Sequence, residues 1–299
     1  TLTILSSTGF HYYETVNQSL QLQWLPIADA PRIMGWMMAL GSAATFIVYL
    51  IILLLWEPLG LGYNVVYVCG GAATVIIAVF AMVAYPQFEG PTVQNKSMVL
   101  RKRYWLYYAL QFMSGARRQI FVVFAGFMMV EKFGFQVHEV TILFLLNFIV
   151  SMLFAPIVGK AINLFGERWI LIVEYVGLTI IFLAYAGIYY FDWTVTVGII
   201  LFIANHLFFS MSFAIKTYFQ KIAEPYDIGS SVAVAFTINH IPAVFLPAVL
   251  GYIWIVEPSG IFVMAALMAL LSLILAFFVP RNPEPGAETI LNIRKRNRE

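Results

Sequence analysis

The stretch IFVMAALMALLSLILAFFV, residues 261–279, has no charged side chain and is long enough to cross a bilayer as a helix. A hydrocarbon core of about 30 Å needs roughly 20 consecutive apolar residues. Seven similar stretches precede it, so the sequence predicts eight membrane spans. These spans are 33–56, 62–85, 104–129, 140–162, 169–190, 193–213, 230–255 and 261–279.

The overall composition excludes a water-soluble domain. Hydrophobic residues make up 62% of the 299 residues, charged residues only 11%, and the mean hydropathy is +0.86. A soluble core could not bury this many apolar helices, and only helices or closed barrels satisfy their backbone inside lipid. The sequence therefore predicts an all-α polytopic membrane protein. The net charge of +2 is too small to indicate a nucleic-acid partner.

The basic residues predict the orientation of these spans. Of the seventeen lysines and arginines, three lie inside or at the end of spans and one, Lys132, lies in a loop on one side. The other thirteen fall on the opposite side if the loops alternate, which the positive-inside rule assigns to the cytoplasm. The loop 86–103 and the C-terminal tail are then cytoplasmic. The thirteen are Arg32, Lys96, Arg101, Lys102, Arg103, Lys160, Arg168, Lys221, Arg281, Arg294, Lys295, Arg296 and Arg298.

The loop 86–103, PQFEGPTVQNKSMVLRKR, is the one long polar connection and divides the chain. Two spans precede it within residues 1–85, and six follow it within residues 104–280, which has the size of a self-contained six-helix bundle. The tail 281–299 is rich in proline and charge, and we expect it to be disordered beyond Gly286.

The first 24 residues are too polar for a lipid-facing helix. Glu14, Asn17, Gln18 and Gln21 recur at i, i+3, i+4 and i+7 and form a continuous polar stripe on a helix. Two interpretations are open: a solvated amphipathic helix, or a partial membrane helix whose polar stripe faces a water-filled cavity.

The loop between the spans 140–162 and 169–190 reads GKAINLFGER, residues 159–168. It resembles the G-x-x-x-D-R-x-G-R-R/K cytoplasmic loop of the major facilitator superfamily of transporters. Gly159, Gly166 and Arg168 match, whereas Asn163 replaces the aspartate, and a leucine and a glutamate replace two arginines. The loop also lies second in the six-span block, on the side that the charges assign to the cytoplasm.

The resemblance implies an architecture for nearly the whole chain. Residues 104–280 would be helices seven to twelve of such a transporter, and 86–103 the central loop between its halves. Residues 1–85 would be a remnant of the N-terminal half: the end of helix four, which lines the cavity in this family, and helices five and six. The chain would then be a fragment without helices one to three. The family also implies secondary active transport by alternating access, with protons as the coupling ion.

Ionisable residues inside spans are costly and usually face a cavity. In the span 104–129, Gln111, Ser114, Gly115 and Arg118 share one helical face with Tyr107, and Gly115 would let the helix bend. An arginine fork suits a carboxylate or phosphate of a substrate. The alternative for Arg118 and for Arg117, which lies about 100° away, is an internal ion pair that holds helices together.

Other polar groups are candidates for the same cavity. Asn205 shares a face with Lys216, which could instead extend to the membrane interface. Asn205-His206 and Asn239-His240 could relay protons or simply bond helices together. Glu14 is the best candidate for proton coupling or for a counter-ion, while we expect Glu174 to pair with Arg168. The predicted cavity residues are Glu14, Asn17, Gln21, Gln111, Arg117, Arg118, Asn205, Asn239 and His240.

The sequence contains no set of residues that indicates an enzyme. We find no nucleophile elbow, zinc-binding His-Glu-x-x-His, phosphate loop or dinucleotide-binding glycine pattern, and we expect no metal and no cofactor. The favoured hypothesis is a multi-pass transporter of the plasma (inner) membrane whose partners are a small-molecule solute, the lipid bilayer and protons. The alternatives are a membrane sensor or assembly factor on the same fold and, less favoured, an intramembrane enzyme. The sequence does not identify the solute.

The charge distribution makes a prediction about topology. With Cys69 replaced, a membrane-impermeant thiol reagent added outside intact cells should label Pro258→Cys and leave Ser97→Cys unlabelled. Permeabilised cells, in which both sites should react, provide the control. The reverse pattern would overturn the helix assignment.

Overall fold

The predicted spans are helical in the computed structural model, which describes residues 2–60, 62–84, 92–98 and 100–296. Residues 86–91 and 99 of the predicted central loop and 297–299 of the tail lie outside this range. The helices are α1 (Leu2–Trp24), α2 (Ala30–Leu59), α3 (Tyr63–Ala84), η1 (Lys102–Tyr104), α4 (Trp105–Ile120), η2 (Phe121–Ala125), α5 (Gly126–Glu131), α6 (Val137–Phe165), α7 (Glu167–Phe191), α8 (Val195–Phe209), η3 (Ser210–Phe213), α9 (Ala214–Ile222), η4 (Pro225–Asp227), α10 (Ile228–Val256), α11 (Pro258–Phe277) and α12 (Ile290–Arg296).

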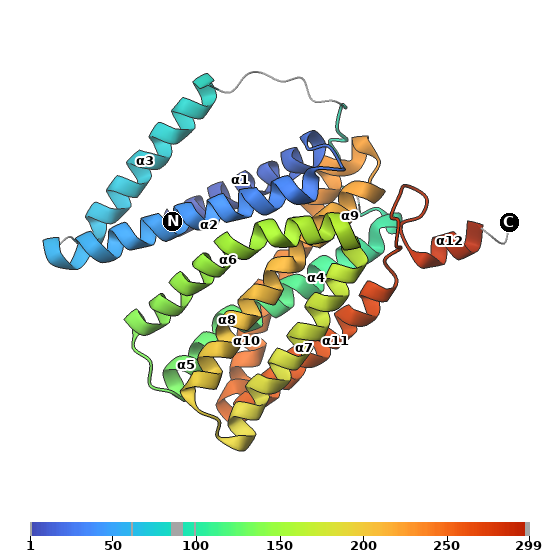
Figure 1. The fold of residues 1–299 in the computed structure, drawn as a ribbon. Helices are drawn as coiled ribbons and strands as arrows, with labels where there is room; N and C mark the ends of the chain where they lie inside the picture. The colour runs from blue at the N-terminus through green and yellow to red at the C-terminus, as the bar shows by residue number, and fades with distance from the viewer. Residues whose placement is uncertain (1, 61, 85–91, 99, 297–299) are drawn as a thin grey trace.

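Seven helical segments within the described residues are long and apolar enough to cross a membrane. The predicted span 104–129 is not among them, because its two arginines and two glutamines make it more polar than the others. It still forms a nearly unbroken helix through α4, η2 and α5, among the other helices of the bundle (Figure 1). The chain is an all-α polytopic membrane protein.

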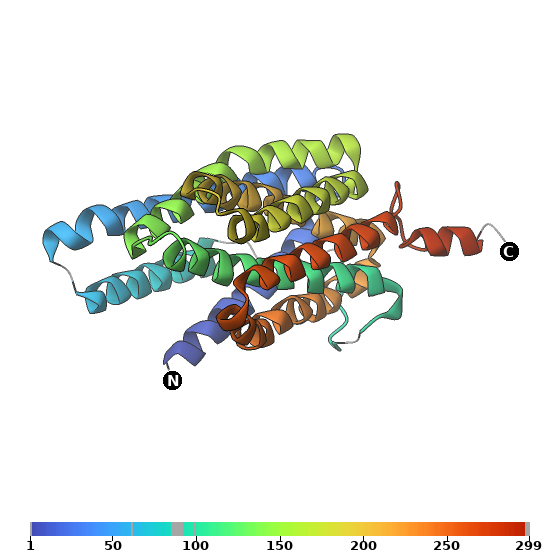
Figure 2. The same cartoon turned by 90° about the horizontal axis from the view of Figure 1, so that it is seen from below.

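The helices from α4 to α11 form a bundle whose members run roughly side by side (Figures 1 and 2). Within it, α7 packs along α11 and α8, and α4 packs along α10 and α11. The first two helices lie on this bundle: α2 along α6, and α1 against α10 and α9. By contrast, α3 stands apart in Figure 1, and its described side chains are exposed except for Val66 and Ala81, which are partly buried.

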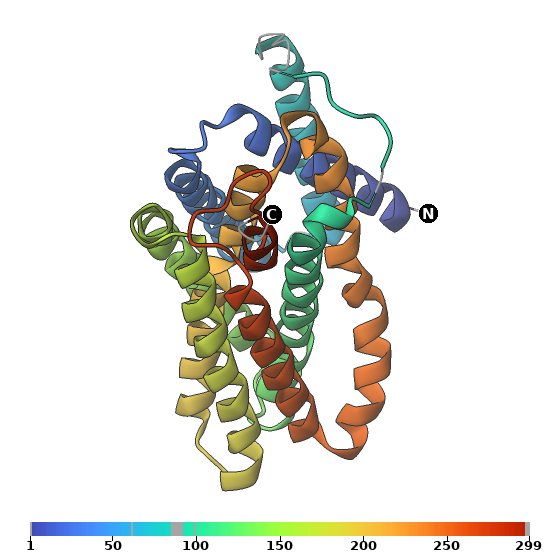
Figure 3. The same cartoon turned by 90° about the vertical axis from the view of Figure 1, so that its right-hand side faces the viewer.

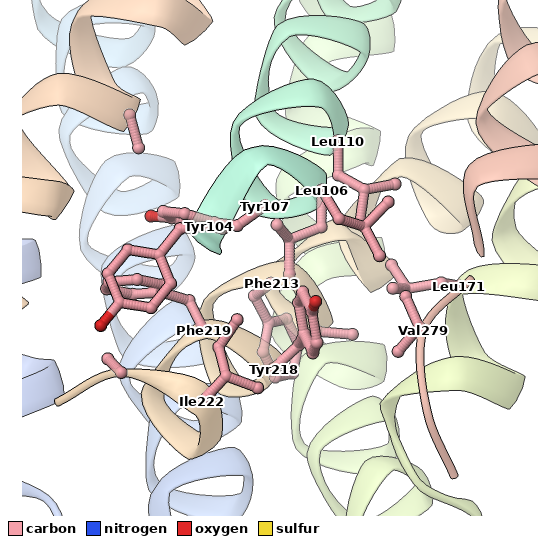
Figure 4. Close-up of a cluster of buried hydrophobic side chains, with 14 of the residues drawn as sticks. Tyr104, Leu106, Tyr107, Leu110, Leu171, Phe213, Tyr218, Phe219, Ile222 and Val279 are labelled. Atoms are coloured by element: carbon pink, nitrogen blue, oxygen red, sulfur yellow. The ribbon is translucent and has the colours of Figure 1, made fainter. Parts of the chain in front are cut away.

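Two hydrophobic clusters form the interior. One, at the end of the bundle near the tail, includes Tyr107, Phe219 and Val279 (Figure 4). The rings of Tyr107 and Phe219 stack there with centroids 4.1 Å apart. The other cluster includes Phe124 and Phe262 and fills the opposite end. The helices are therefore held together at both ends.

Glycines allow three of the closest backbone approaches between helices. An added Cβ on Gly159 of α6 would overlap the carbonyl oxygen of Pro31 in α2, and one on Gly35 of α2 would lie 2.5 Å from the carbonyl oxygen of Ala155. Gly115 of α4 meets the backbone of α10 in the same way. Helices in lipid associate largely through such close packing of small residues.

Gly115 lies within the continuous helix α4 and serves a close contact with α10. The departure from α-helical geometry comes one to two turns later, where Phe121–Ala125 forms a π-helical turn. A π turn inserts one residue into the helix and changes which side chains face inward afterwards. Within this turn, Phe121 and Phe124 are buried, while Val122 is 46% exposed.

Gly166 forms the junction between α6 and α7 with φ of 82°, a conformation that side chains disfavour. The next residue, Glu167, is buried and pairs with Lys221 at 2.7 Å. The structural ion pair predicted for Glu174 is confirmed, but its partner is Arg117 inside the bundle and not Arg168. Asn163, in the same loop motif, is exposed.

The expected disorder beyond Gly286 is wrong for residues 287–296. Glu288 is 3% exposed, and the tail continues into α12, which lies beyond one end of the bundle in Figures 1 and 2 and in front of it in Figure 3. The guanidinium of Arg103 donates to the Glu288 carboxylate at 2.6 Å, and the hydroxyl of Tyr218 donates to the Glu288 carbonyl at 2.5 Å. The tail is therefore fastened to the segment that precedes α4 and to α9.

Loops expected on the same side of the membrane lie at the same end of the bundle. The tail contacts Arg103, and Glu167 after α6 pairs with Lys221 at the end of α9. At the opposite end, Lys132 pairs with Asp192 at 2.9 Å and joins the loops after α5 and α7. The alternation on which the charge count depends is thus present in the fold.

The anchoring of the tail should depend on the charge of Glu288. Burial raises the pKa of this carboxyl, but hydrogen bonds from backbone N–H groups, Arg103 and Asn292 outweigh that effect and leave the pKa lowered. A lowered pKa means that the stabilisation is complete above the ordinary glutamate value of about 4.3 and is lost as the pH falls through the lower folded value. At neutral pH, Arg103→Gln should speed hydrogen exchange in 290–296 by about tenfold or more.

Lys102→Gln is the matched control, because Lys102 is exposed and adjacent to Arg103. It should leave exchange in α12 unchanged. Equal exchange rates in the wild type and in Arg103→Gln would contradict the assigned anchor.

Candidate functional site

A cavity of about 300 Å³ lies where α1 meets the bundle. Helix α1 contributes one side, α2 a single methionine, and α4, α10 and the region from α8 to α9 the remaining walls. A volume of this size suits a small molecule. The lining residues are Phe10, Glu14, Gln18, Met38, Gln111, Ser114, Arg118, Phe209, Ser212, Phe213, Lys216, Phe236, Asn239 and His240.

Three side chains that carry charge face this cavity: Glu14 from α1, Arg118 from α4 and Lys216 from α9. Glu14 lies close enough to both cations to interact with them electrostatically. Within the described residues, none of the three makes an ion pair at 4.0 Å or less. Unpaired charges inside a membrane protein are expensive and usually serve a transported ligand or ion.

One polar wall is held in place by hydrogen bonds between α4 and α10. The side-chain amide of Asn239 donates to the backbone carbonyl of Gln111 at 2.9 Å and to its side-chain oxygen at 3.2 Å. This bond requires the two helices to be nearly in backbone contact, which Gly115 permits. Gln111 and Asn239 are therefore preorganised.

Two histidines from different helices meet beside the cavity. The ring centroids of His11 and His240 are 4.9 Å apart, and Nδ1 of His240 lies 2.8 Å from the carbonyl oxygen of Phe236. A carbonyl oxygen only accepts, so Nδ1 carries a proton and Nε2 remains available to a ligand.

The rest of the lining is apolar. It consists of four aromatic rings and one thioether, from Phe10, Phe209, Phe213, Phe236 and Met38. The cavity lining therefore combines charged and hydrogen-bonding groups with apolar surface.

The structure brings together five of the nine predicted cavity residues: Glu14, Gln111, Arg118, Asn239 and His240. The stripe on α1 is rotated from its predicted position. Phe10, Glu14 and Gln18, spaced by four residues, line the cavity, whereas Asn17 and Gln21 do not and instead bond to each other at 3.2 Å.

Arg117 does not face the cavity. Its side chain is completely buried, lies 3.5 Å from the Glu174 carboxylate, donates to Ser272 and covers the ring of Tyr175 at 4.5 Å. It thus has the helix-joining role that was the alternative interpretation, between α4, α7 and α11.

Asn205 also lies outside the cavity, buried in α8. Its neighbour His206 bonds through Nε2 to the hydroxyl of Ser151 at 2.7 Å and so joins α8 to α6. This contact is the simple interhelical bond expected as one alternative for the Asn-His pairs.

Lys216, Ser114, Ser212 and Gln18 line the cavity although they were not among the predicted cavity residues. Helical spacing in the sequence could have identified two of them, because Ser212 and Lys216 share a helical face with Phe209. Within the described residues, no group of three or more histidine, cysteine or acidic side chains could hold a metal ion.

The amino-acid sequence matches the model of one known protein family. The model of the Major Facilitator Superfamily matches residues 2–247 and 107–298, which together include nearly the whole chain. The chain belongs to the Major Facilitator Superfamily. Members of the superfamily are generally transporters, built as two related halves with the solute site near the bilayer midplane. A search of curated proteins found no match.

The adjacent arginines make a matched pair for a stability test. Arg117→Ala leaves the buried Glu174 carboxylate without its cation and should lower the free energy of unfolding by about 3–5 kcal/mol. Arg118→Ala changes a side chain that faces the cavity and should cost no more than about 1 kcal/mol. Denaturation in mixed detergent micelles measures both.

Arg117→Leu with Glu174→Leu should recover much of the lost stability, since it removes both buried charges. Equal destabilisation by Arg117→Ala and Arg118→Ala would show that the two arginines do not have different roles.

Proposed function

We propose that this protein is a secondary active transporter that moves a small solute through the cavity by alternating access, driven by an ion gradient and most simply by protons. The observation that carries the proposal is the location of the cavity. It lies between α1 with Met38 of α2 on one side and the bundle of α4 to α11 on the other. Relative motion of these two parts would change its access.

Contacts between the two parts support such a motion. They meet through Gly159 and Pro31 and through Gly35 and Ala155. The side-chain amide of Gln220 in α9 also donates to the carbonyl oxygens of Leu22 and Leu25, at 3.0 and 2.8 Å. These contacts lie at the end of α1 where the tail is also bound, so parting them would open the cavity at that end.

Glu14 is the residue proposed to couple transport to protons. It is the only carboxylate among the residues that line the cavity, and both cations there act on it. Protonation would remove the charge of Glu14 and make the net charge of the cavity lining more positive, without any movement of the backbone.

The orientation proposed for the membrane follows from the basic residues. Arg103, Lys221 and Arg281 lie at the same end of the bundle as the tail, while Lys132 lies at the other. The positive-inside rule then places the tail in the cytoplasm, most simply at the plasma (inner) membrane.

The proposal predicts that Gly159 controls turnover and not binding. Gly159→Leu would force α2 and α6 apart and strain the closed state, so it should reduce solute flux through proteoliposomes of the full-length protein by about 5- to 100-fold. The dissociation constant of the solute should change little, because Gly159 is not a cavity residue.

Gly126→Leu is the matched control, since an added Cβ there meets nothing within 4 Å. Weaker binding with normal turnover in Gly159→Leu would contradict the proposal. Solute binding by the wild type with no flux under any ion gradient would favour a sensor built on the same fold.

A further inference from the structure

The charge balance of the cavity narrows the class of solute. Arg118 and Lys216 are two cations, and Glu14 is the only carboxylate among the lining residues. The lining residues therefore carry a net positive charge even with His240 neutral. Resting on the transport function proposed above, we propose that the solute is a small organic anion whose acid group binds between Arg118 and Lys216 and whose apolar body lies against the phenylalanine rings.

The donors around the cavity fit an acid group. The guanidinium of Arg118 is a planar fork that matches the two oxygens of a carboxylate, and the ammonium of Lys216 adds a second charged donor. Ser114 lies one helical turn before Arg118, and Ser212 one turn before Lys216, and both line the cavity. Each cation thus has a neighbouring hydroxyl that can also donate to the acid.

The apolar part of the lining favours a solute with an organic body over a bare inorganic anion. Phe10, Phe209, Phe213 and Phe236 offer only apolar ring surface to the cavity. A phosphate or sulfate ion would leave that surface in contact with water, whereas a solute with an apolar or aromatic body would cover it.

The charge of Glu14 opposes binding of the acid group. It competes with the solute for both cations, because it interacts electrostatically with each of them. Loss of its charge would leave Arg118 and Lys216 free for the acid group. Anion binding and uptake of a proton by Glu14 would therefore favour each other, as symport requires.

The test uses three probes of nearly the same shape and different charge. Benzoate, benzamide and benzamidine are anionic, neutral and cationic, and inorganic phosphate is the fourth probe, an anion without an apolar body. Binding to the purified full-length protein in detergent is measured by calorimetry. Benzoate should bind most tightly, by about tenfold or more over benzamide, with benzamidine and phosphate weaker still.

Variants at the three charged positions make the test specific. Arg118→Gln and Lys216→Gln should each weaken benzoate binding by about 10- to 100-fold and leave benzamide binding unchanged. Glu14→Gln should tighten benzoate binding. The matched control Lys102→Gln removes one cation from the exposed surface and should have no effect.

Failures of the two proposals give different results. The organic-anion site is overturned if benzoate does not bind, or if benzamide or benzamidine binds at least as tightly as benzoate. The apolar contact is overturned if phosphate binds more tightly than benzoate. If proteoliposomes transport a neutral or cationic solute, the transport function stands and the proposal of an anionic solute is overturned. Benzoate binding that Arg118→Gln weakens, without flux of any anion, supports the anion site and overturns transport.

Discussion

The structure depends on how closely helices can approach one another in lipid, where the hydrophobic effect gives little reason for apolar helices to associate. Gly35 and Gly159 bring α2 against α6, and Gly115 brings α4 against α10. Each contact is between backbones, so no side chain can be added without moving a helix. The first contact joins α2, which carries Met38 of the cavity lining, to the bundle, and the second allows Asn239 to bond to Gln111 inside the cavity.

Two consecutive arginines show how helix geometry separates structure from function. Consecutive residues point about 100° apart on a helix. Arg117 therefore faces α7 and α11, where it pairs with Glu174 and donates to Ser272, while Arg118 faces the cavity with Lys216. One charge is neutralised and stabilises the bundle. The other remains unpaired and available, which is the arrangement that a binding site for an anion needs.

Much of the fold could be predicted from the sequence, because apolar length and charge in loops depend on the bilayer and not on detailed packing. The candidate site was harder. Helical spacing identifies the polar face of α4, but it does not fix the rotation of α1, so it indicates Asn17 and Gln21 where Gln18 lines the cavity. Nor could spacing distinguish Arg117 from Arg118, because only the position of Glu174 on another helix decides between them. The ordered tail was missed because Glu288 becomes buried only through the distant residues Arg103 and Tyr218.

The central claim is that α2 and α6 separate at their glycine contact when the cavity changes access. Spin labels at the exposed positions Ile27 and Leu164, in a Cys69→Ala background, report the distance between the chain just before α2 and the end of α6. In lipid nanodiscs the account predicts two distance populations, a short one that matches the present structure and a longer one. Bound solute and the substitution Glu14→Gln should each change the fraction of molecules in the longer population. A single distance that no solute, pH or Glu14→Gln substitution alters would contradict the account.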